Sequence, residues 1–189
     1  MKKSAECRVL SAVICAAGSS ARMGGKVRKP YLKLRGRPIL SWTLAALARL
    51  PELNEVVLVT RPEDRATALN AARLAKLPRR VKIVFADGGP RRQDSVHNGL
   101  KATRCDAGLV LIHDAARPFP ELKALKRLCG AALQCGGAIL ACRVRDTLKK
   151  ERAGADGSTI ERTVSRTGLW QAQTPQAFRR AEYWSVSSV

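Results

Sequence analysis

Short apolar runs alternate along this chain with longer stretches in which apolar residues recur every three or four positions. The short runs predict strands at Val9 to Ala16, Glu55 to Thr60, Val81 to Phe85, Leu109 to His113 and Ala138 to Cys142. The longer stretches predict helices at Ile39 to Leu50, Pro62 to Lys76, Asp94 to Ala102 and Glu121 to Cys135. This alternation is typical of an α/β protein whose mostly parallel sheet carries helices on both faces.

Polar, glycine-containing segments follow three of the predicted strands. They read "AAGSSARMGGKVRKP" from Ala16, "ADGGPRRQDSV" from Ala86 and "HDAARPF" from His113. The carboxyl ends of parallel strands meet at one edge of a sheet, where ligands bind in open α/β folds. Glycine lets the backbone approach a ligand, and Arg and Lys supply charge, so the segments predict a phosphate-binding rim. By composition alone, the first segment also fits a flexible turn with solvated basic residues.

Length and charge limit the classes of protein. The 189 residues are enough for one domain with a hydrophobic core, and we expect a single domain over residues 1–189. Hydrophobic residues make up 46% of the chain and aromatic residues 4%, which predicts a core of Ala, Val, Leu and Ile. The 35 Lys and Arg against 15 Asp and Glu give a net charge of +20, which attracts nucleic acid, acidic membranes and phosphorylated small molecules alike.

The cysteines and the start of the chain bear on its compartment. The six cysteines contain no CxxC pair and several lie in apolar segments, which is typical of reduced thiols in a cytoplasmic protein. Lys2-Lys3 followed by "VLSAVICAA" imitates a secretory signal, but Glu6 and Arg8 interrupt it. No apolar run approaches the ~20 residues that cross a bilayer. We therefore expect a cytoplasmic protein with no membrane partner.

Five motifs in order resemble one family. They are AAGxxxRMG with Lys29 seven residues after Arg22, "GGPRRQDSV", "HDAARPF", "RDT" at Arg145 to Thr147, and "RTGLWQAQTPQAF" from Arg166. The first is similar to sugar-phosphate nucleotidyltransferases in general. The set resembles the 2-C-methyl-D-erythritol 4-phosphate cytidylyltransferases of the non-mevalonate route to isoprenoid precursors. The resemblance implies that the phosphate of methylerythritol phosphate attacks the α-phosphate of CTP and expels pyrophosphate, with Mg²⁺ as cofactor.

The resemblance also implies roles for individual residues. The catalytic cations would be Arg22, Lys29 and Arg166. The nucleotide would be bound by Ala16, Ala17, Gly18, Ser19, Ser20, Gly88, Gly89, Arg92, Ser95 and Thr174. Asp114 would hold the metal and, with Arg117, Arg145, Asp146 and Thr147, the substrate. Such a reaction needs no strong base, because the attacking phosphate oxygen is already an anion; it needs anions brought together and charge stabilised.

The polar segment from Arg145 to Gly168 has no obvious buried face. In the family it is an arm, about residues 145–168, that reaches the active site of a second subunit. We therefore expect a Rossmann-like three-layer α/β/α fold with a protruding dimerisation arm, and a homodimer that acts on small molecules. A mobile surface loop is the alternative.

Two departures from the family pattern stand out. Where the family usually has Pro-Lys-Gln, this chain has Arg28-Lys29-Pro30, and proline fixes φ and lacks an amide donor. Family members also continue past "TPQAF" to a strand with an Asn-Ile-Lys motif, whereas this chain runs "RRAEYWSVSSV" to Val189. The C-terminal part of the family domain is therefore expected to be missing, with reduced activity as one consequence.

Simpler interpretations compete with several assignments. Lys29 fits an ordinary surface lysine, Asp114 fits a helix cap after a strand, and Thr174 fits a turn before Pro175. A ribitol 5-phosphate cytidylyltransferase shares the first motif and the "TPQ" segment, although "HDAARPF" and "RTGLW" favour the first family. A nucleic-acid-binding module fits the charge, but the basic residues are scattered and no aromatic platform or binding motif is present.

Overall fold

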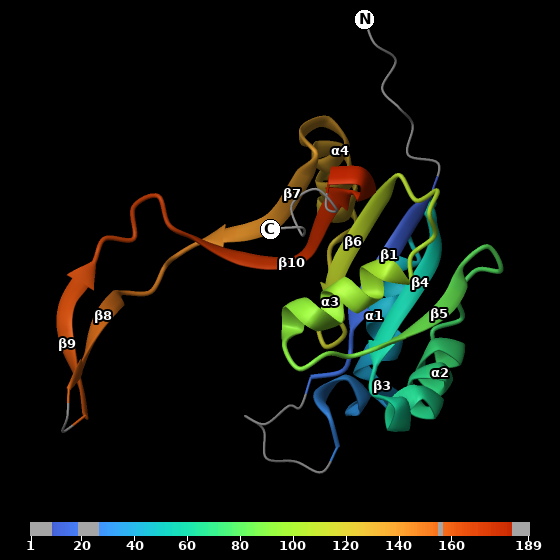
Figure 1. The fold of residues 1–189 in the computed structure, drawn as a ribbon, viewed down its shortest axis with the longest axis horizontal. Coiled ribbons are helices and arrows are strands. Elements are labelled where there is room, and N and C mark those ends of the chain that lie inside the picture. Colours follow the sequence, from blue (N-terminus) through green and yellow to red (C-terminus); the bar gives the residue numbers. More distant parts are fainter. Residues whose placement is uncertain (1–8, 19–26, 155–156, 183–189) are drawn as a thin grey trace, which may run out of the picture.

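A six-stranded sheet forms the centre of the molecule (Figure 1). The computed structural model describes residues 9–18, 27–154 and 157–182. The strand order is β5-β4-β1-β6-β10-β7. The bounds are β1 Leu10–Cys15, β4 Leu53–Thr60, β5 Lys82–Asp87, β6 Leu109–Asp114, β7 Gly137–Arg143 and β10 Trp170–Arg179. The strands β5, β4, β1 and β6 pair in parallel, and β10 runs antiparallel to both of its neighbours.

Side-chain alternation on the central strands builds two cores. In β1, Ala12 and Ile14 pack into one cluster, whereas Val13, opposite Val57 and Ile112, packs into the other. All of these side chains are nearly or fully buried. Strands buried on both faces read as continuous apolar runs, which is why the sequence predicted them.

Helices cover both faces of the sheet. The larger core contains apolar residues of α1 (Ile39–Leu47), α2 (Arg65–Leu74) and α4 (Leu122–Cys135), and the smaller core contains Val96 and Leu100 of α3 (Arg92–Lys101). Two short 3-10 helices are also present, η2 (Lys29–Tyr31) and η3 (Pro62–Asp64). The strands β2 (Lys33–Leu34) and β3 (Arg37–Pro38) pair with each other in a two-stranded sheet. The three-layer α/β/α prediction is confirmed, and Figure 1 shows α3 across the near face of the sheet.

The predicted elements are all present, with ends shifted by a few residues. The predicted helix from Pro62 begins as η3 and continues as α2. The sequence interpretation missed β10, the antiparallel strand between β6 and β7. Its Gln171, Gln173 and Pro175 hide the apolar pattern, and its register shifts between Ala172 and Gln176.

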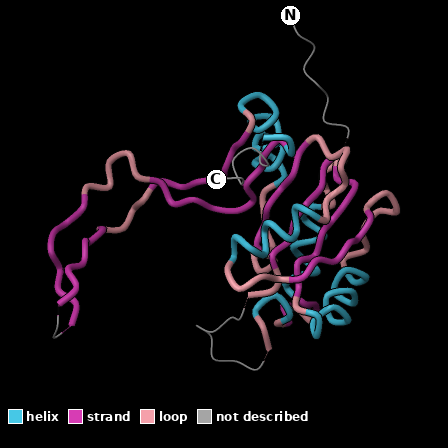
Figure 2. Tube along the Cα trace, in the orientation of Figure 1, coloured by secondary structure: helices cyan, strands magenta, loops and turns pink. Residues whose placement is uncertain are grey.

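A hairpin projects from the sheet at the position of the expected arm. It consists of β8 (Leu148–Gly154) and β9 (Gly157–Val164), which pair only with each other among the described strands. Figures 1 and 2 show it extending well away from the sheet. Almost all of its described side chains are exposed. Within the described residues, the helices are too short or too polar to span a bilayer.

Candidate active site

A pocket of about 670 Å³ opens where the parallel strands end. The segments that follow β1, β5 and β6 line it together, as the sequence predicted. From the predicted site it contains Ala16, Ala17, Gly18, Lys29, Gly88, Gly89, Arg92, Ser95, Asp114 and Arg117. Arg22, Ser19 and Ser20 lie outside the described residues. Lys29 and Asp114 therefore share one concave site, which also contains Arg61, Arg91, Arg92 and Arg117.

Asp114 lies at the end of β6 and receives hydrogen bonds from two arginines. Arg92 Nη2 donates to its Oδ1 at 2.9 Å, and Arg117 Nε donates to its Oδ2 at 3.2 Å. Burial raises the pKa of Asp114, but the hydrogen bond and charge of Arg92 with the charge of Arg117 outweigh burial and lower it. Asp114 is therefore ionised, and it holds two guanidinium groups at the rim of the pocket.

His113 supports this arrangement from inside the core. Its ring is fully buried, and Nε2 lies 2.9 Å from the carbonyl oxygen of Arg117, to which it donates as the neutral Nε2–H tautomer. Burial lowers the pKa of His113 to about 4. A buried neutral histidine bonded to the backbone fixes the turn that carries Arg117, and it is not placed to act as a base.

The glycines after β5 bring two loops into contact. A Cβ at Gly88 would lie 2.3 Å from Ala17 Cβ, and one at Gly89 would lie 2.4 Å from Asp94 Cβ. The Gly89 amide donates to Ser95 Oγ at 2.9 Å, and the Gly88 amide donates to the Thr60 carbonyl at 2.9 Å. Both glycines are therefore required by the packing of the pocket wall, whatever they do for a ligand.

The Arg28-Lys29-Pro30 departure is accommodated by η2. Pro30 and Tyr31 are buried, and Pro30 lies within the first turn, where a helix does not use the amide hydrogen. Lys29 begins η2 and lines the pocket. The lysine thus reaches the pocket from a short helix whose proline does not disturb it.

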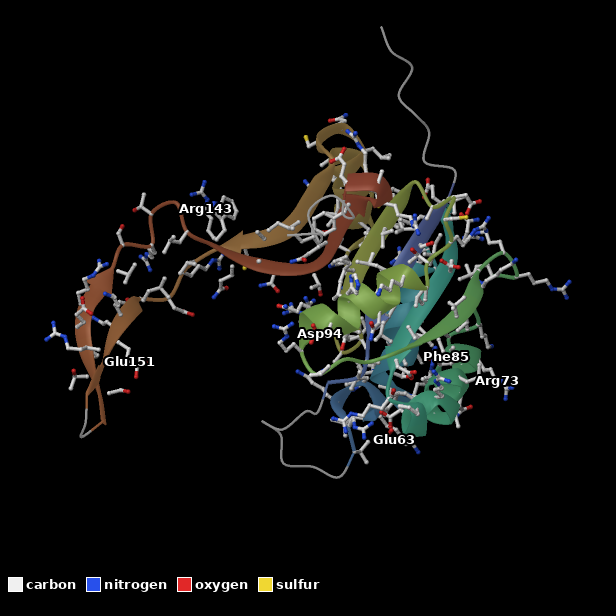
Figure 3. The ribbon with its side chains drawn as sticks, in the orientation of Figure 1. Glu63, Arg73, Phe85, Asp94, Arg143 and Glu151 are labelled. Atoms are coloured by element: carbon white, nitrogen blue, oxygen red, sulfur yellow. The ribbon has the colours of Figure 1, made fainter. Side chains whose placement is uncertain are left out.

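The predicted residues of the arm lie in a second hollow. Arg145, Asp146 and Arg166 line a volume of about 920 Å³ at the base of the hairpin, together with Arg143 and Trp170. The Arg143 guanidinium lies 4.7 Å from the centre of the Trp170 ring, and Arg166 Nη1 donates to the Arg145 carbonyl. Thr147 follows directly in the chain. Figure 3 places Arg143 where the hairpin leaves the sheet.

The start of β10 links the two hollows. Gln173 Oε1 accepts a hydrogen bond from Arg117, while its amide nitrogen lies 3.8 Å from Cys142 Sγ at the base of the hairpin. Thr174 Oγ1 accepts a hydrogen bond from the Asp114 amide at 3.3 Å. Thr174 lies within β10, so the simple turn before Pro175 is wrong, and its hydroxyl ties this strand to the end of β6.

Comparison with known proteins decides the family. Residues 10–186 match the model of the family described as IspD, 2-C-methyl-D-erythritol 4-phosphate cytidylyltransferase. The chain belongs to this family. The IspD enzyme of Geobacillus thermodenitrificans is 42% identical over 168 residues, which are 89% of this chain and 71% of that protein. A bifunctional IspD/IspF enzyme of Rhodospirillum rubrum is 45% identical over 172 residues, 90% of this chain and 42% of its own length.

Solved structures of IspD proteins have the same fold. The 4-diphosphocytidyl-2C-methyl-D-erythritol synthase of Anaerococcus prevotii aligns with a TM-score of 0.75 at 30% identity, covering 97% of this chain and 77% of that one. The cytidylyltransferase of Thermus thermophilus aligns with a TM-score of 0.67 at 31% identity, covering 96% of this chain and 78% of its own. The likeness extends over almost all of the chain.

The sequence did not indicate two arginines of the IspD pocket, and the helix-cap alternative for Asp114 is also wrong. These are Arg61, which directly follows β4, and Arg91, which bonds Asp94 through its guanidinium. Arg61 could have been found by applying the strand-end rule to the second predicted strand. Asp114 does not cap a helix, because α4 begins at Leu122 with Glu121 as its N-cap.

The metal-binding capacity of the described site is small. Asp114 is the only carboxylate among the described residues lining the pocket, and no group of three or more His, Cys, Asp or Glu side chains gathers in the described part of the chain. Mg²⁺ commonly binds through one or two carboxylates and completes its shell with phosphate oxygens and water. The donor chemistry therefore fits a magnesium ion that arrives with a polyphosphate.

Proposed function

We propose that this chain transfers a cytidylyl group from CTP to 2-C-methyl-D-erythritol 4-phosphate. An oxygen of the sugar-alcohol phosphate forms a bond to the α-phosphorus of CTP, the bond from that phosphorus to the bridging oxygen of the β-phosphate breaks, and pyrophosphate leaves. The observation that carries the proposal is the pocket at the strand ends, where Lys29 and Arg91 line the same cavity as Asp114 and the two arginines bonded to it, in a chain of the IspD family. Arg92 and Arg117 are the arginines bonded to Asp114, whereas Arg91 bonds Asp94.

The pocket residues act by binding and orienting anions. Lys29, Arg92 and Arg117 present cationic groups from three different segments, so a triphosphate can be contacted on several sides. Asp114 keeps Arg92 and Arg117 in fixed directions before the substrate arrives. Pre-oriented cations lower the barrier because little reorganisation remains when charge builds on the α-phosphate. No step requires a base, which agrees with the buried, backbone-bonded state of His113.

Magnesium is part of the proposal. Asp114 is the residue that would hold Mg²⁺, together with the phosphate oxygens of CTP. When bound, the ion neutralises phosphate charge and fixes the geometry of the triphosphate. Calorimetric titration of CTP with and without Mg²⁺, on wild type and on Asp114→Asn, tests this assignment. A loss of the magnesium effect in the variant supports it, and an equal effect in both proteins contradicts it.

The remaining contacts stay predictions carried over from the family motifs. Gly88, Gly89 and Ser95 would approach the base and ribose, supported by their position in the pocket wall. Thr174 would act near the phosphates, supported by its bond to the Asp114 amide. Arg22, Ser19 and Ser20 complete the proposed nucleotide loop. A cytoplasmic location also stays a prediction.

The direct test is the reaction itself. Purified protein with CTP and Mg²⁺ is expected to release pyrophosphate with methylerythritol phosphate and far less with ribitol 5-phosphate. Lys29→Ala is expected to lower kcat/KM by roughly 100-fold to 1,000-fold, because one cation at the developing charge is lost. Lys82→Ala, an exposed lysine on the edge strand β5, is the matched control and is expected to retain wild-type rates. Release with ribitol 5-phosphate alone would overturn the assignment.

The proposed function also includes a role for the hairpin. We infer that the β8–β9 hairpin reaches a second copy and brings Arg166, Arg145, Asp146 and Thr147 to that copy's pocket. Support comes from the isolation of the hairpin, because a lone two-stranded hairpin is marginally stable in water. Exposed apolar side chains lie on the hairpin and at its base, where Ile160 of β9 is 68% exposed and Trp170 of β10 is 54% exposed.

Mixing two inactive variants tests this arrangement. Lys29→Ala and Arg166→Ala damage different ends of the proposed composite site. If each site takes Lys29 from one chain and Arg166 from the other, co-expression gives mixed dimers with one intact site, and about a quarter of wild-type activity returns by random pairing. Activity that never exceeds that of the separate variants, in dimers verified by sedimentation, contradicts the shared site.

A further inference from the structure

Arg61, Glu63 and Asp64 directly follow β4. They contact the chain at Ala17 and at Arg28, on either side of the glycine-rich segment after β1. Arg61 Nε donates to the Ala17 carbonyl at 3.2 Å, at the point where the chain leaves β1. Arg28, directly before Lys29, donates through Nη2 to Glu63 Oε1 at 2.9 Å and through Nη1 to Asp64 Oδ2. One short segment therefore contacts the chain just before and just after residues 18–27.

The two ends are joined through one carboxylate. Glu63 Oε1, which accepts from Arg28, also lies 3.8 Å from Arg61 Nη1. The Arg28–Asp64 pair is mostly shielded from water, with 20% and 15% of the two side chains exposed. Ion pairs that are shielded and shared between several groups hold geometry better than isolated surface pairs. Figure 3 shows Glu63 beside the blue part of the ribbon that contains η2.

The signs of the charges argue against a purely electrostatic role. Glu63 and Asp64 place two negative charges beside Lys29 and the pocket proposed to bind a triphosphate, which by itself weakens anion binding. Their contacts with Arg28 instead fix the backbone from which Lys29 starts η2. A cation acts on a reacting phosphate only if it is held in place, and a displacement of about 1 Å can cost a factor of 100 in rate.

From this geometry we infer that Arg61, Glu63 and Asp64 form a clamp that positions Lys29 and the Ala17 end of the nucleotide segment for CTP. The clamp rests on the proposed function, and its members are positioning residues. Arg28 is the residue through which the clamp acts on Lys29. The arrangement also gives a physical reason for arginine at position 28, because it supplies the ion pairs that hold η2 against η3.

Variants at Arg28 and Asp64 separate positioning from charge. Asp64→Asn removes a negative charge near the pocket, so a charge effect alone would lower the KM for CTP. Loss of the clamp is instead expected to raise the KM for CTP by about tenfold. Arg28→Ala is expected to raise KM similarly, and Arg28→Lys, which keeps the charge but not the two-pronged contact, is expected to fall between Arg28→Ala and wild type. In all three, kcat is expected to fall as well, because Lys29 is then held less firmly at the developing charge.

A matched control and a binding measurement complete the test. Arg104→Ala breaks an exposed Arg104–Asp106 pair of 2.7 Å far from the pocket and is expected to leave KM unchanged. Thermal midpoints are recorded for every variant. Folded Asp64→Asn protein with an unchanged or lowered KM overturns the clamp. If wild type releases no pyrophosphate, the proposed function fails, while calorimetric CTP affinity of the same variants still decides for or against the clamp.

Discussion

The residues around the pocket contact one another across four strand ends, whereas the hairpin side chains mostly face solvent. Arg92 and Asp114 are 22 positions apart in the chain, and Ala17 and Arg61 are 44 apart, yet each pair is hydrogen-bonded. In the hairpin, ion pairs such as Lys150–Glu161 connect only β8 with β9. The pocket therefore obtains its geometry from the folded domain, whereas the described part of the chain gives the hairpin no such support.

This difference predicts how each region responds to substitution. Changes in the pocket propagate to neighbouring strands, because its side chains share partners. Changes in the hairpin leave the sheet intact and affect only what the hairpin contacts in an assembly.

Asp114→Asn is expected to lower the activity of the pocket strongly. The amide cannot hold both guanidinium groups as a carboxylate does, so Arg92 and Arg117 lose their fixed directions, and kcat/KM falls by about 100-fold or more. Steady-state pyrophosphate release measures the change. Asp87→Asn removes the same charge from an exposed pair with Arg65 of 2.9 Å and is expected to stay within about threefold of wild type. Faster turnover of Asp114→Asn would show that the carboxylate opposes the reaction.

The buried histidine predicts a pH dependence of stability. The pKa of His113 is lowered by burial from 6.5 to about 4, so the unfolded chain takes up the proton first. The stability present above pH 6.5 is lost as the pH falls from 6.5 towards 4, by roughly 3 kcal/mol for this residue. Urea unfolding of wild type and His113→Gln across this range measures it. The glutamine amide can donate to the Arg117 carbonyl but does not titrate, so parallel curves for the two proteins would contradict the prediction.

The sequence predicts some elements of this protein and not others. Apolar runs such as Leu109–Asp114 reveal strands because both faces are buried, whereas β10 was missed because its polar residues interrupt the pattern. The three loops around the pocket follow from the strand-end rule and the motifs. The Arg92–Asp114 pair and the contacts of Arg61 do not, because they depend on strand register and side-chain direction between distant segments.

Gly88→Ala is expected to destabilise the fold without removing any polar contact. The added methyl group would lie 2.3 Å from Ala17 Cβ, so two loop backbones must separate, at a cost of about 2 kcal/mol. The thermal midpoint is expected to fall by about 4–8 °C. Gly18→Ala is the matched control, because no described atom lies within 4 Å of its added methyl group, and its midpoint is expected to change little. Equal midpoints for both variants would mean that the pocket wall at Gly88 accommodates the methyl group without a loss of stability.

Replacing residues 148–164 by a short glycine-serine turn is expected to have the smallest effect on the stability of the single chain. The hairpin adds little buried surface to the sheet, so the free energy of unfolding should change by less than about 1 kcal/mol, and the urea m-value should fall only slightly. Urea unfolding at low protein concentration measures this, since any stabilisation by a second copy is then minimal. A loss of several kcal/mol under these conditions would mean that the hairpin supports the sheet directly. The shortened chain could instead keep the stability of the single chain but no longer become more stable as its concentration rises. In that case, the hairpin would contribute only through contacts between copies.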